Sequence, residues 1–528
     1  MVDGNSPTLC EAMDLTTVAL AVGVISLLAY YFRKSIKPKD FPPGPSYVPI
    51  LGSVPFLPRK VWKTAEIPIA EYLNDTYGDI SGVYDPDRPV IVVSDPEVVR
   101  RLFKMEECSG RPGGKPFSKA RYGQDDGKSR GLLMSEGDEW KEQRRFTMRS
   151  LKDLGFGKTS MEDSINHEVE KLVRLLQKDY VGKPMGLNNV MNLSIVNALW
   201  VLMVGETLEL DDPKLLRIVG AIDQLIRRGN VTSKPLLKKL ATFVGPWAIE
   251  KFDSLYKERD KVLSAIKNLV IPYIREHKQV NEGIESGNDH TDYIEDYLKE
   301  IKRNTNNLSS SFNGKRGEES LVISLVDLFL AGTETTTSSL MWAILFLLHH
   351  PKVQDQLHEE LDKVLGEKET ITYEERTRVP YTCAVINEIH RHSSIVRLAL
   401  PHKITDDISV SGYRFPRGSV VQANLLRIHH DERYWTDPHI FNPERFYDRQ
   451  KDVCVSNTNL MPFSVGKRYC LGQSLAEKEL FMFFVGLIKA FKFQPSKEDG
   501  LPDCDHKSGS HKGTIRSAPF YKVILEKR

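Results

Sequence analysis

The stretch Phe463-Ser464-Val465-Gly466-Lys467-Arg468-Tyr469-Cys470-Leu471-Gly472 decides the fold of this chain. An apolar helix is predicted directly after it, so Cys470 lies at a helix N-terminus, where the helix dipole and unpaired amides stabilise a thiolate. Gly466 and Gly472 allow tight backbone paths beside a flat cofactor. Phe463 can shield the sulfur, and Arg468 can make a two-pronged contact with a carboxylate. A lone cysteine is normally a small buried hydrophobe, but this arrangement indicates that Cys470 is a ligand.

Composition sets outer limits on the function. The 528 residues have the composition of an ordinary globular protein, and a formal net charge of +2 argues against nucleic-acid binding. The six cysteines form no CxxC pair, so neither a zinc site nor a thioredoxin-like motif is indicated, and a reducing compartment is favoured. Glycosylation sequons point weakly the other way, and we expect them to be silent in the cytosol; they lie at Asn74, Asn192, Asn230 and Asn307.

The N-terminal segment has the pattern of a membrane anchor. Residues from Leu15 to Phe32 form an apolar run that approaches the length of a bilayer span. Acidic residues precede the run and basic residues follow it, so the positive-inside rule places the bulk of the chain on the cytosolic side. A cleaved signal peptide is the alternative, but its basic n-region and small-residue cleavage site are missing. We therefore expect a lumenal tail (1–14), a transmembrane anchor (15–32), a basic, proline-rich hinge (33–46) and one globular body (47–528).

The body is predicted to be mostly α-helical with small β-sheets, and nothing in it demands a second domain. Helices are expected over Asn166–Gln177, Asp253–Glu276, Ser320–His350, Pro351–Leu365, Tyr381–His392 and Leu471–Phe493. Strand patterns occur at Pro89–Val93 and at Ile408–Gln422. The polar segment Asn304–Glu319 is expected to be a surface loop.

The helix predicted over Ser320–His350 is apolar at both ends but polar at its centre. Asp327, Glu334 and the run Thr335–Ser339 would be expensive inside a membrane, which argues against a second span. A helix buried in a large protein core explains both the apolar flanks and the polar centre. That centre is therefore a candidate for chemistry.

The Cys470 segment resembles the haem-binding loop of the cytochrome P-450 family, whose pattern is Phe-x-x-Gly-x-Arg-x-Cys-x-Gly. Every fixed position of that pattern is present in this chain. The resemblance implies the fold of that family, here preceded by one N-terminal transmembrane helix. It also implies a haem b with Cys470 as the axial ligand of the iron, which makes residues 47–528 a haem-thiolate catalytic domain.

A second segment, Ala331-Gly332-Thr333-Glu334-Thr335-Thr336, resembles the oxygen-activation segment of the same family. By this resemblance Ala331 and Gly332 let the helix pass close to a haem face. Glu334 and Thr335 place an acid beside a hydroxyl, which is what proton delivery to bound dioxygen requires. The local alternative is that Thr335 only bonds back to a carbonyl of its own helix.

Two further motifs resemble parts of the family that hold the haem and its loop. Glu388 and Arg391 match the Glu-x-x-Arg pair, and the loop Phe441–Phe446 supplies Arg445 as the third partner; their implied role is structural. The implied partners of the haem propionates are Trp140, Arg144, Arg468 and His402. Trp140 could otherwise be only a core aromatic, and His402 only a structural histidine.

These motifs imply a monooxygenase that uses dioxygen as co-substrate. No dinucleotide or flavin fingerprint is apparent, so electrons from NADPH must come through a separate flavoprotein reductase, which for an anchored member implies the endoplasmic reticulum membrane. Basic residues near the haem motifs are candidates for docking that reductase: Lys141, Arg144, Arg145 and Lys467.

The implied substrate is a lipophilic small molecule, such as a steroid, fatty acid or xenobiotic. The family's substrate-contacting stretches fall at about Gly113–Leu132, Ile395–Ala399 and Gly513–Ser517, and Arg397 in the second either anchors a polar substrate group or serves the haem and the structure. A haem-thiolate isomerase or dehydratase is one alternative, and a non-catalytic haem sensor is another. The intact Glu334–Thr335 pair argues against both.

Overall fold

The chain was examined as a computed structural model. It describes residues 15–34, 37–48, 51–58, 61, 66–85, 88–113, 128–155, 159–227, 264, 267–268, 270–279, 292–368, 370–496, 500–505, 509 and 515–528. Several predicted features lie wholly or mostly outside these residues: the tail 1–14, Asn230, the N-terminal part of Asp253–Glu276, most of Gly113–Leu132 and the start of Gly513–Ser517.

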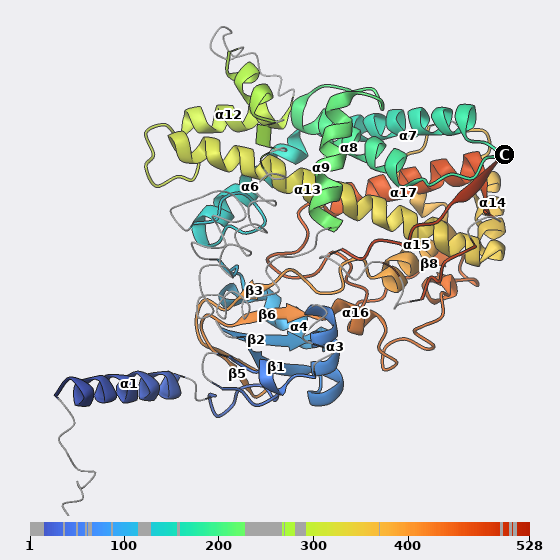
Figure 1. The fold of residues 1–528 in the computed structure, drawn as a ribbon. Coiled ribbons are helices and arrows are strands. Elements are labelled where there is room, and N and C mark those ends of the chain that lie inside the picture. Colours follow the sequence, from blue (N-terminus) through green and yellow to red (C-terminus); the bar gives the residue numbers. More distant parts are fainter. Residues whose placement is uncertain are drawn as a thin grey trace, which may run out of the picture.

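Long helices form one side of the molecule (Figure 1). They are α6 (Gly137–Asp153), α7 (Thr159–Asp179), α8 (Asn188–Val204), α9 (Pro213–Arg227), α12 (Tyr293–Arg303), α13 (Gly314–His349), α14 (Pro351–Leu365), α15 (Pro380–Ser393) and α17 (Gln473–Ala490). α13 is buried along most of its length because it packs against α8, α15 and α17. The core around it contains fully buried aromatic side chains such as Trp200, Trp342 and Phe346, each of which contributes roughly 1.5–3 kcal/mol of hydrophobic stabilisation.

A β-rich region forms the other side. Its four-stranded sheet has the order β1 (Ile80–Tyr84), β2 (Pro89–Val93), β6 (Val420–Ala423), β3 (His402–Lys403). The helices α3 (Glu66–Tyr77), α4 (Pro96–Lys104) and α16 (Leu425–His429) lie beside this sheet (Figure 1). β2 and β6 pair in parallel, with Val90 opposite Val420. This pairing ties the start of the body to its C-terminal half.

Short elements complete the described part of the fold. Three two-stranded sheets pair β4 (Ile408–Val410) with β5 (Tyr413–Phe415), β7 (Tyr447–Asp448) with β8 (Val453–Cys454), and β9 (Phe491–Pro495) with β10 (Val523–Lys527). The 3₁₀ helices are η1 (Val54–Phe56), η2 (Glu106–Cys108), η4 (Tyr373–Thr377) and η5 (Pro443–Phe446). The mostly α architecture with small sheets is therefore confirmed.

Three element boundaries differ from the sequence prediction. The segment Gly314–Glu319 is the first part of α13 and not a loop, because its charged residues form ion pairs with other helices, as between Arg316 and Glu139 at 2.7 Å. The strand pattern Ile408–Gln422 is divided at Ser411 and Gly412, which both have positive φ; β4 and β5 form a hairpin while β6 joins the other sheet. The last apolar helix ends at Ala490, where the chain continues as β9.

The predicted anchor coincides with α1 (Leu15–Lys34), which Figure 1 shows apart from the rest of the chain. In the part of the chain that the structure describes, no helix combines the length and apolarity needed to cross a membrane. The transmembrane anchor thus stays a prediction.

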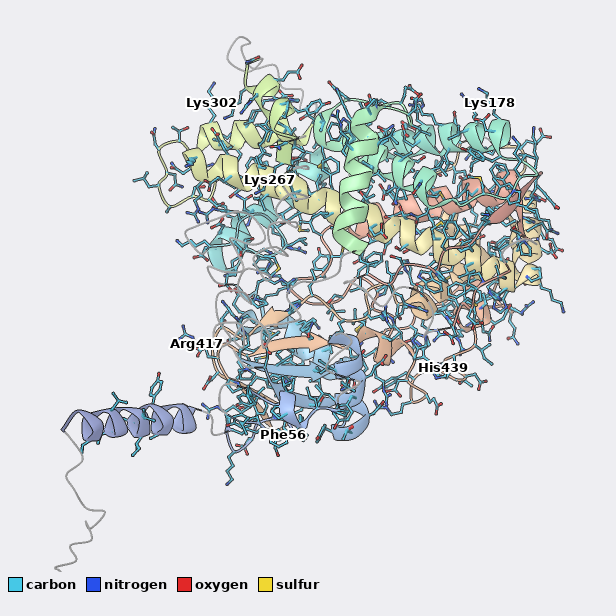
Figure 2. The ribbon with its side chains drawn as sticks, in the orientation of Figure 1. Phe56, Lys178, Lys267, Lys302, Arg417 and His439 are labelled. Carbon is cyan, nitrogen blue, oxygen red and sulfur yellow. The ribbon has the colours of Figure 1, made fainter. Side chains whose placement is uncertain are left out.

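Many charged residues lie on the surface, and Lys178, Lys302 and Arg417 project outward in Figure 2. Two of the predicted sequons are not on this surface. Asn74 is 5% exposed and Asn192 is 2% exposed, whereas Asn307 is exposed. Glycosylation of the folded chain is therefore blocked at Asn74 and Asn192 by burial.

Candidate functional site

The loop that carries Cys470 is closed on itself and held against α4. The Cys470 amide donates a hydrogen bond to the Phe463 carbonyl oxygen at 2.9 Å, and the Lys467 amide donates to the Phe103 carbonyl oxygen at 2.8 Å. Gly466 has a φ of +79°, and a Cβ there would overlap the Phe103 carbonyl. Only glycine fits such a position. Gly466 is thus required by the contact with α4.

The sulfur of Cys470 borders space inside the protein. Its side chain is solvent-accessible, yet burial is the largest influence on its pKa and raises it, while the Gly472 amide and Arg144 lower it. Accessibility together with desolvation means that the sulfur faces an enclosed space. Gly472 is the N-cap of α17, and a Cβ there would meet no atom within 4 Å. The thiol therefore needs a strong cationic partner to be held as a thiolate.

Arg468 lies beneath the surface with one nitrogen unused. Its Nε donates to the Ser109 carbonyl oxygen at 2.8 Å and its Nη2 to that of Ser135 at 2.7 Å. Its Nη1 is buried and has no hydrogen-bond partner among the described residues. Burial lowers the pKa of Arg468, and the nearby charges of Arg111 and Arg144 lower it further. This guanidinium is suited to an anionic group that has yet to bind.

Trp140 and Arg144 of α6 lie next to this arginine, as predicted. The Arg468 guanidinium lies 3.7 Å from the centre of the Trp140 ring, and Trp140 is 5% exposed. Arg144 donates from Nη2 to the Tyr469 carbonyl oxygen at 2.9 Å and lies over the Tyr469 ring. Both residues therefore border the Cys470 loop directly.

His402 occupies a more restricted position than the sequence suggested. It is 2% exposed, stacks on Phe103 with ring centres 3.8 Å apart, and contacts the Cys108 carbonyl oxygen through Nδ1 at 2.7 Å. A carbonyl only accepts, so Nδ1 carries the proton in the neutral ring. Burial holds the pKa of His402 well below its usual range. His402 can donate to a propionate through Nε2 only if it is protonated, which the burial opposes.

One face of α13 is open at the predicted oxygen-activation segment. Ala331 is exposed and Thr335, one turn later, is half-buried, although the flanking parts of α13 are buried. Thr335 Oγ1 donates to the Ala331 carbonyl oxygen at 2.7 Å, so the local bond that was the alternative reading is present. Gly332 turns toward α8, where a Cβ would lie 2.7 Å from Leu199 Cδ1. The structure thus gives Gly332 a packing role, and its contact with a haem face stays a prediction.

Glu334 lies on a buried side of α13, away from that open face. It is 6% exposed, and its Oε1 accepts hydrogen bonds from Ser338 Oγ at 3.3 Å and from Ser517 Oγ at 3.1 Å. Ser517 belongs to the C-terminal segment that was predicted to contact substrate. The acid and the alcohol are adjacent in sequence, but their side chains have different surroundings.

The structure brings Glu388, Arg391 and Arg445 together, as the sequence predicted. Arg391 binds Glu388 with two hydrogen bonds of 2.7 and 2.8 Å, and both side chains are 0% exposed. Arg445 Nε donates to Glu388 Oε1 at 3.3 Å. Arg391 also donates to the carbonyl oxygens of His429 and Pro438. The group joins α15 to the long loop before Cys470.

The sequence analysis did not recognise Arg111, and it recognised Asp327 without its partners. Arg111 is 4% exposed and donates to the carbonyl oxygens of Leu133 and Pro401, which holds it close to Arg468. Asp327 accepts from the amides of Leu132 and Leu133, both at 2.9 Å, and so attaches the segment before α6 to α13. Its charge in an apolar helix was a visible signal, but its partners lie far away in sequence.

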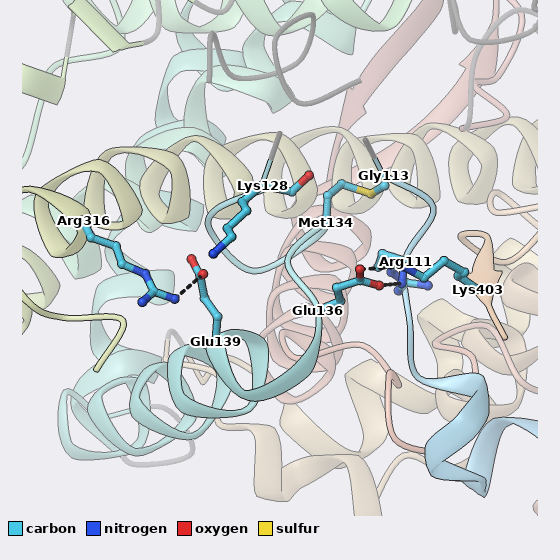
Figure 3. A pocket seen from close by; sticks show the side chains of 9 residues that line it. Arg111, Gly113, Lys128, Met134, Glu136, Glu139, Arg316 and Lys403 are labelled. Carbon is cyan, nitrogen blue, oxygen red and sulfur yellow. Dashed lines mark hydrogen bonds and ion pairs between the residues drawn. The ribbon is translucent and has the colours of Figure 1, made fainter. Parts of the chain in front are cut away.

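A pocket of about 530 Å³ lies beside Arg111 (Figure 3). Its lining is mostly charged and comprises Arg111, Gly113, Lys128, Ser129, Met134, Glu136, Glu139, Arg316 and Lys403. Glu139 forms an ion pair with Arg316, and Glu136 forms one with Lys403 and also accepts a hydrogen bond from the backbone amide of Arg111. Because neither Cys470 nor Thr335 lines it, this pocket is not the predicted reaction chamber.

Arg397 is placed apart from the arginines that surround Cys470. It is 3% exposed, and burial, partly offset by the carboxylate of Glu71 on α3, lowers its pKa to about 10. Its charge also lowers the pKa of Arg516. Its surroundings favour a structural role near the C-terminal segment over one at the propionates.

The residues present fit a haem. A soft sulfur donor faces enclosed space, a buried guanidinium nitrogen is left for a carboxylate, and an open helix face carries a hydroxyl. Cys470 would hold the iron, while Arg468, Trp140 and Arg144 are placed to bind propionates. The predicted set, apart from Gly332 and His402, is thus compatible with a flat, dianionic cofactor.

Comparison with known proteins identifies the family of this chain. The model of the cytochrome P-450 family matches residues 42–523. Human cytochrome P-450 2J2 is 32% identical over 485 residues, which is 91% of either chain. Rabbit 2J1 is 31% identical over 488 residues, 91% of either chain, and mouse 2C44 is 31% identical over 523, covering 98% of this chain and 100% of the relative. The family implies a haem-thiolate cofactor. This chain belongs to the cytochrome P-450 family of monooxygenases.

Proposed function

We propose that the protein is a membrane-anchored monooxygenase that hydroxylates a lipophilic small molecule, with Cys470 as the axial ligand of haem b. The single observation that carries this proposal is the Cys470 side chain, exposed yet desolvated, in one loop with Arg468, whose buried Nη1 has no hydrogen-bond partner among the described residues. When bound, the haem supplies an iron that activates dioxygen with electrons that come ultimately from NADPH. The protein supplies binding, orientation and protons.

The Cys470 loop and α6 perform the binding. The hydrogen bonds of the Cys470 and Lys467 amides fix the position of the sulfur. Arg468 is held by the Ser109 and Ser135 carbonyls, so its Nη1 is already oriented toward a carboxylate. A ligand set that is fixed before binding loses little entropy when the cofactor enters.

Proton delivery is assigned to Thr335 and Glu334. Thr335 Oγ1 now donates to the Ala331 carbonyl, so it must rotate away from that bond to donate a proton into the open space. Glu334 must likewise break its hydrogen bond with the Ser517 hydroxyl or relay its proton through water. Both groups are then movable donors on neighbouring faces of one helix.

Membrane attachment is assigned to α1. Its side chains include exposed Leu20, Val22 and Ile25, and a basic segment follows it. Exposed apolar surface on one helix is suited to a lipid bilayer. We infer a single anchor in the endoplasmic reticulum membrane, with the tail 1–14 in the lumen, the hinge 33–46 at the surface and the body 47–528 in the cytosol.

Electron supply is assigned to an NADPH-dependent flavoprotein reductase. The docking surface would comprise Lys141, Arg145 and Lys467, which are exposed. Lys141 and Lys467 both pair with Glu106, so their charge is partly balanced before a partner arrives. Arg144 faces the Tyr469 carbonyl and belongs to the haem side. Charge reversal at Lys141 and Arg145 is expected to slow reduction at low salt, and the difference should shrink as salt is added.

The substrate is inferred to be lipophilic, such as a steroid, fatty acid or xenobiotic. The predicted contact stretch near Arg397 contains the buried apolar side chains of Ile395, Leu398 and Ala399. Apolar side chains that border a binding site favour apolar ligands, which is why this stretch supports the proposal.

The test is reconstitution of the purified holoenzyme with reductase, NADPH and a panel of lipophilic compounds. Substrates are first identified by the shift in haem spin state, and NADPH consumption and oxygenated product are then measured. Product that requires both NADPH and dioxygen supports the proposal. Turnover of peroxides without reductant indicates an isomerase or dehydratase, and haem binding without any turnover indicates a sensor; either result overturns it.

A further inference from the structure

A buried histidine connects the Glu388–Arg391 pair to the loop that carries Cys470. His429 is the last residue of α16 and is 1% exposed. Its Nδ1 lies 2.9 Å from Ser394 Oγ, and its Nε2 lies 3.1 Å from the amide nitrogen of Met461. Ser394 Oγ in turn donates to the Arg391 carbonyl oxygen at 2.7 Å. Three hydrogen bonds thus form one chain from Arg391 to Met461.

The directions of these bonds follow from chemistry. A backbone amide only donates, so His429 Nε2 must accept from Met461 and carry no proton. The proton of the neutral ring is then on Nδ1, which donates to Ser394 Oγ. The Ser394 hydroxyl is free to donate to the Arg391 carbonyl, which only accepts. Each of these donors and acceptors is used once. The His429 ring must be neutral for the three hydrogen bonds to form together.

The surroundings keep the ring neutral. His429 is packed against the Arg391 side chain and near His390, and no acidic residue among the described ones raises its pKa. Burial, together with the smaller effects of the Arg391 charge and the neighbouring His390, lowers the pKa of His429 to about 3. At neutral pH the ring therefore has one donor and one acceptor.

The far end of this series of hydrogen bonds, Met461, lies at the base of the Cys470 loop. Met461 is 3% exposed, and its carbonyl oxygen accepts a hydrogen bond from the amide of Ser464 at 3.0 Å. Phe463, whose carbonyl receives the Cys470 amide, lies between them in sequence. A displacement of Met461 is therefore transmitted through two backbone bonds to Cys470.

We propose that His429 is a positioning residue for the axial thiolate, which it ties to the buried Glu388–Arg391 pair through Ser394 and Met461. The inference rests on the proposed ligation of haem iron by Cys470. In this proposal the Glu388–Arg391 ion pair does not contact the Cys470 loop directly, and the neutral imidazole of His429 makes that contact. Loss of His429 loosens the loop and lets the thiolate be replaced by a protonated or displaced sulfur.

The chain offers matched controls for this proposal. His430 is the next residue and is also buried, but its Nδ1 bonds back to the Leu426 carbonyl within the same turn. Ser393 precedes Ser394 and is 1% exposed, but its hydroxyl has no hydrogen-bond partner among the described residues. Changes at His430 and Ser393 remove a buried side chain of the same type as changes at His429 and Ser394. They remove none of the hydrogen bonds that connect Arg391 to Met461.

The experiment uses full-length holoenzyme and the reduced carbon monoxide difference spectrum, which separates thiolate-ligated from thiol-ligated haem. The rate at which the thiolate band is lost on mild heating is measured for each variant. His429→Asn is expected to speed this loss about tenfold and Ser394→Ala about threefold, the scale of one unsatisfied buried group. His429→Gln, whose amide oxygen can still accept from Met461, should lie between wild type and His429→Asn. His430→Asn and Ser393→Ala should stay within about twofold of wild type.

The proposal is overturned if Ser394→Ala behaves like Ser393→Ala, or if His430→Asn loses the band as fast as His429→Asn. If the His429 variants bind no haem at all, the comparison of Ser394→Ala with Ser393→Ala tests the proposal by itself. Absence of a thiolate band in wild type, or its retention in Cys470→Ala, would instead defeat the ligation on which the inference rests. The two failures are therefore distinguishable.

Discussion

The Cys470 loop and the Ala331–Thr336 segment of α13 are built in opposite ways. The loop is held from outside, by the Phe103 carbonyl, by Arg468 bonded to Ser109 and Ser135, and by the network that extends from Glu388. The α13 segment has a regular helical backbone, but Thr335 bonds only to its own helix and Glu334 is held by two serines. The thiolate side is fixed, whereas the acid–alcohol side is lightly restrained.

This difference matches two kinds of chemistry. An axial ligand must stay at one distance from a metal, so a network that over-determines its position is useful. Proton donors must approach and leave a substrate, so a single weak bond is preferable to a network. Variants on the thiolate side should therefore reduce haem binding. Variants on the acid–alcohol side should reduce turnover while the haem stays bound.

The largest effect is expected for Arg391→Lys. A lysine keeps the charge but cannot reproduce the paired bonds to Glu388 or those to the His429 and Pro438 carbonyls. Breaking a buried pair of this kind costs about 3–5 kcal/mol. We expect little or no holoenzyme, measured as haem content per protein after purification.

Arg449→Lys is the matched control. Arg449 also binds a carboxylate with two bonds, to Glu444 at 2.8 and 2.6 Å, but its side chain is 64% exposed. Exposed pairs contribute only about 0–1 kcal/mol, so haem content should be normal. Equal haem content in the two variants would contradict the view that the thiolate side is held by buried bonds.

Low pH should destabilise the fold through the buried histidines on the thiolate side. Burial lowers the pKa of His390 to about 4 and that of His429 to about 3, whereas an unfolded histidine titrates near about 6.5. Below that pH the unfolded chain binds protons that the folded chain refuses, so folding stability is full above about pH 6.5 and falls as pH drops toward about 4. Each residue contributes up to about 1.4 kcal/mol per pH unit. Urea midpoints at neutral pH and about two units lower measure this, and a steeper loss with His429→Asn than in wild type would be inconsistent with it.

Thr335→Ala should leave the fixed side intact. The Thr335 hydroxyl bonds only within α13, so haem content and the thiolate band should be unchanged. Product formed per NADPH should fall by about tenfold or more, because one positioned proton donor is worth that much or more. Thr335→Ser, which keeps the hydroxyl, should restore most of it. A drop in product with the serine variant equal to that with alanine would point to packing instead of proton transfer.

The smallest effect is expected for Ser517→Ala. This change removes one of the two hydroxyls that bind Glu334 Oε1 and leaves the bond from Ser338. Coupling of NADPH to product should change by about threefold, on the scale of one ordinary hydrogen bond. Ser517→Thr should behave like wild type. If Ser517→Ala instead loses haem, the acid belongs to the fixed side and the comparison fails.

Much of the fold was accessible from the sequence because its signals are local. Pro351 and the amphipathic pattern after it predicted α14 with its observed bounds, and the β-rich run Pro89–Val93 is β2. The beginning of α13 was missed because ion pairs with α6 extend this helix. Such pairs join residues far apart in sequence, so the local residue pattern does not reveal them. Similarly, β6 was assigned to the wrong sheet because its partner β2 lies far away in sequence.

The site shows the same limit. Glu388, Arg391 and Arg445 were predicted from their resemblance to the family's Glu-x-x-Arg pair and its later arginine, and the structure brings them together. Arg111 and the partners of Asp327 were missed, since a buried arginine held by carbonyls has no sequence pattern. Gly332 and His402 were recognised, but Leu199 and the Cys108 carbonyl determine what they contact.

The most direct test is the reduced carbon monoxide difference spectrum of Cys470→Ala beside Cys504→Ala. Cys504 is also a free, partly buried cysteine, but it lies outside the loop. We expect the Cys470 variant to lose the thiolate band and all NADPH-dependent turnover, and the Cys504 variant to keep both. A Cys470→Ala protein that retained either the band or the turnover would contradict the assignment of this sulfur as the haem ligand.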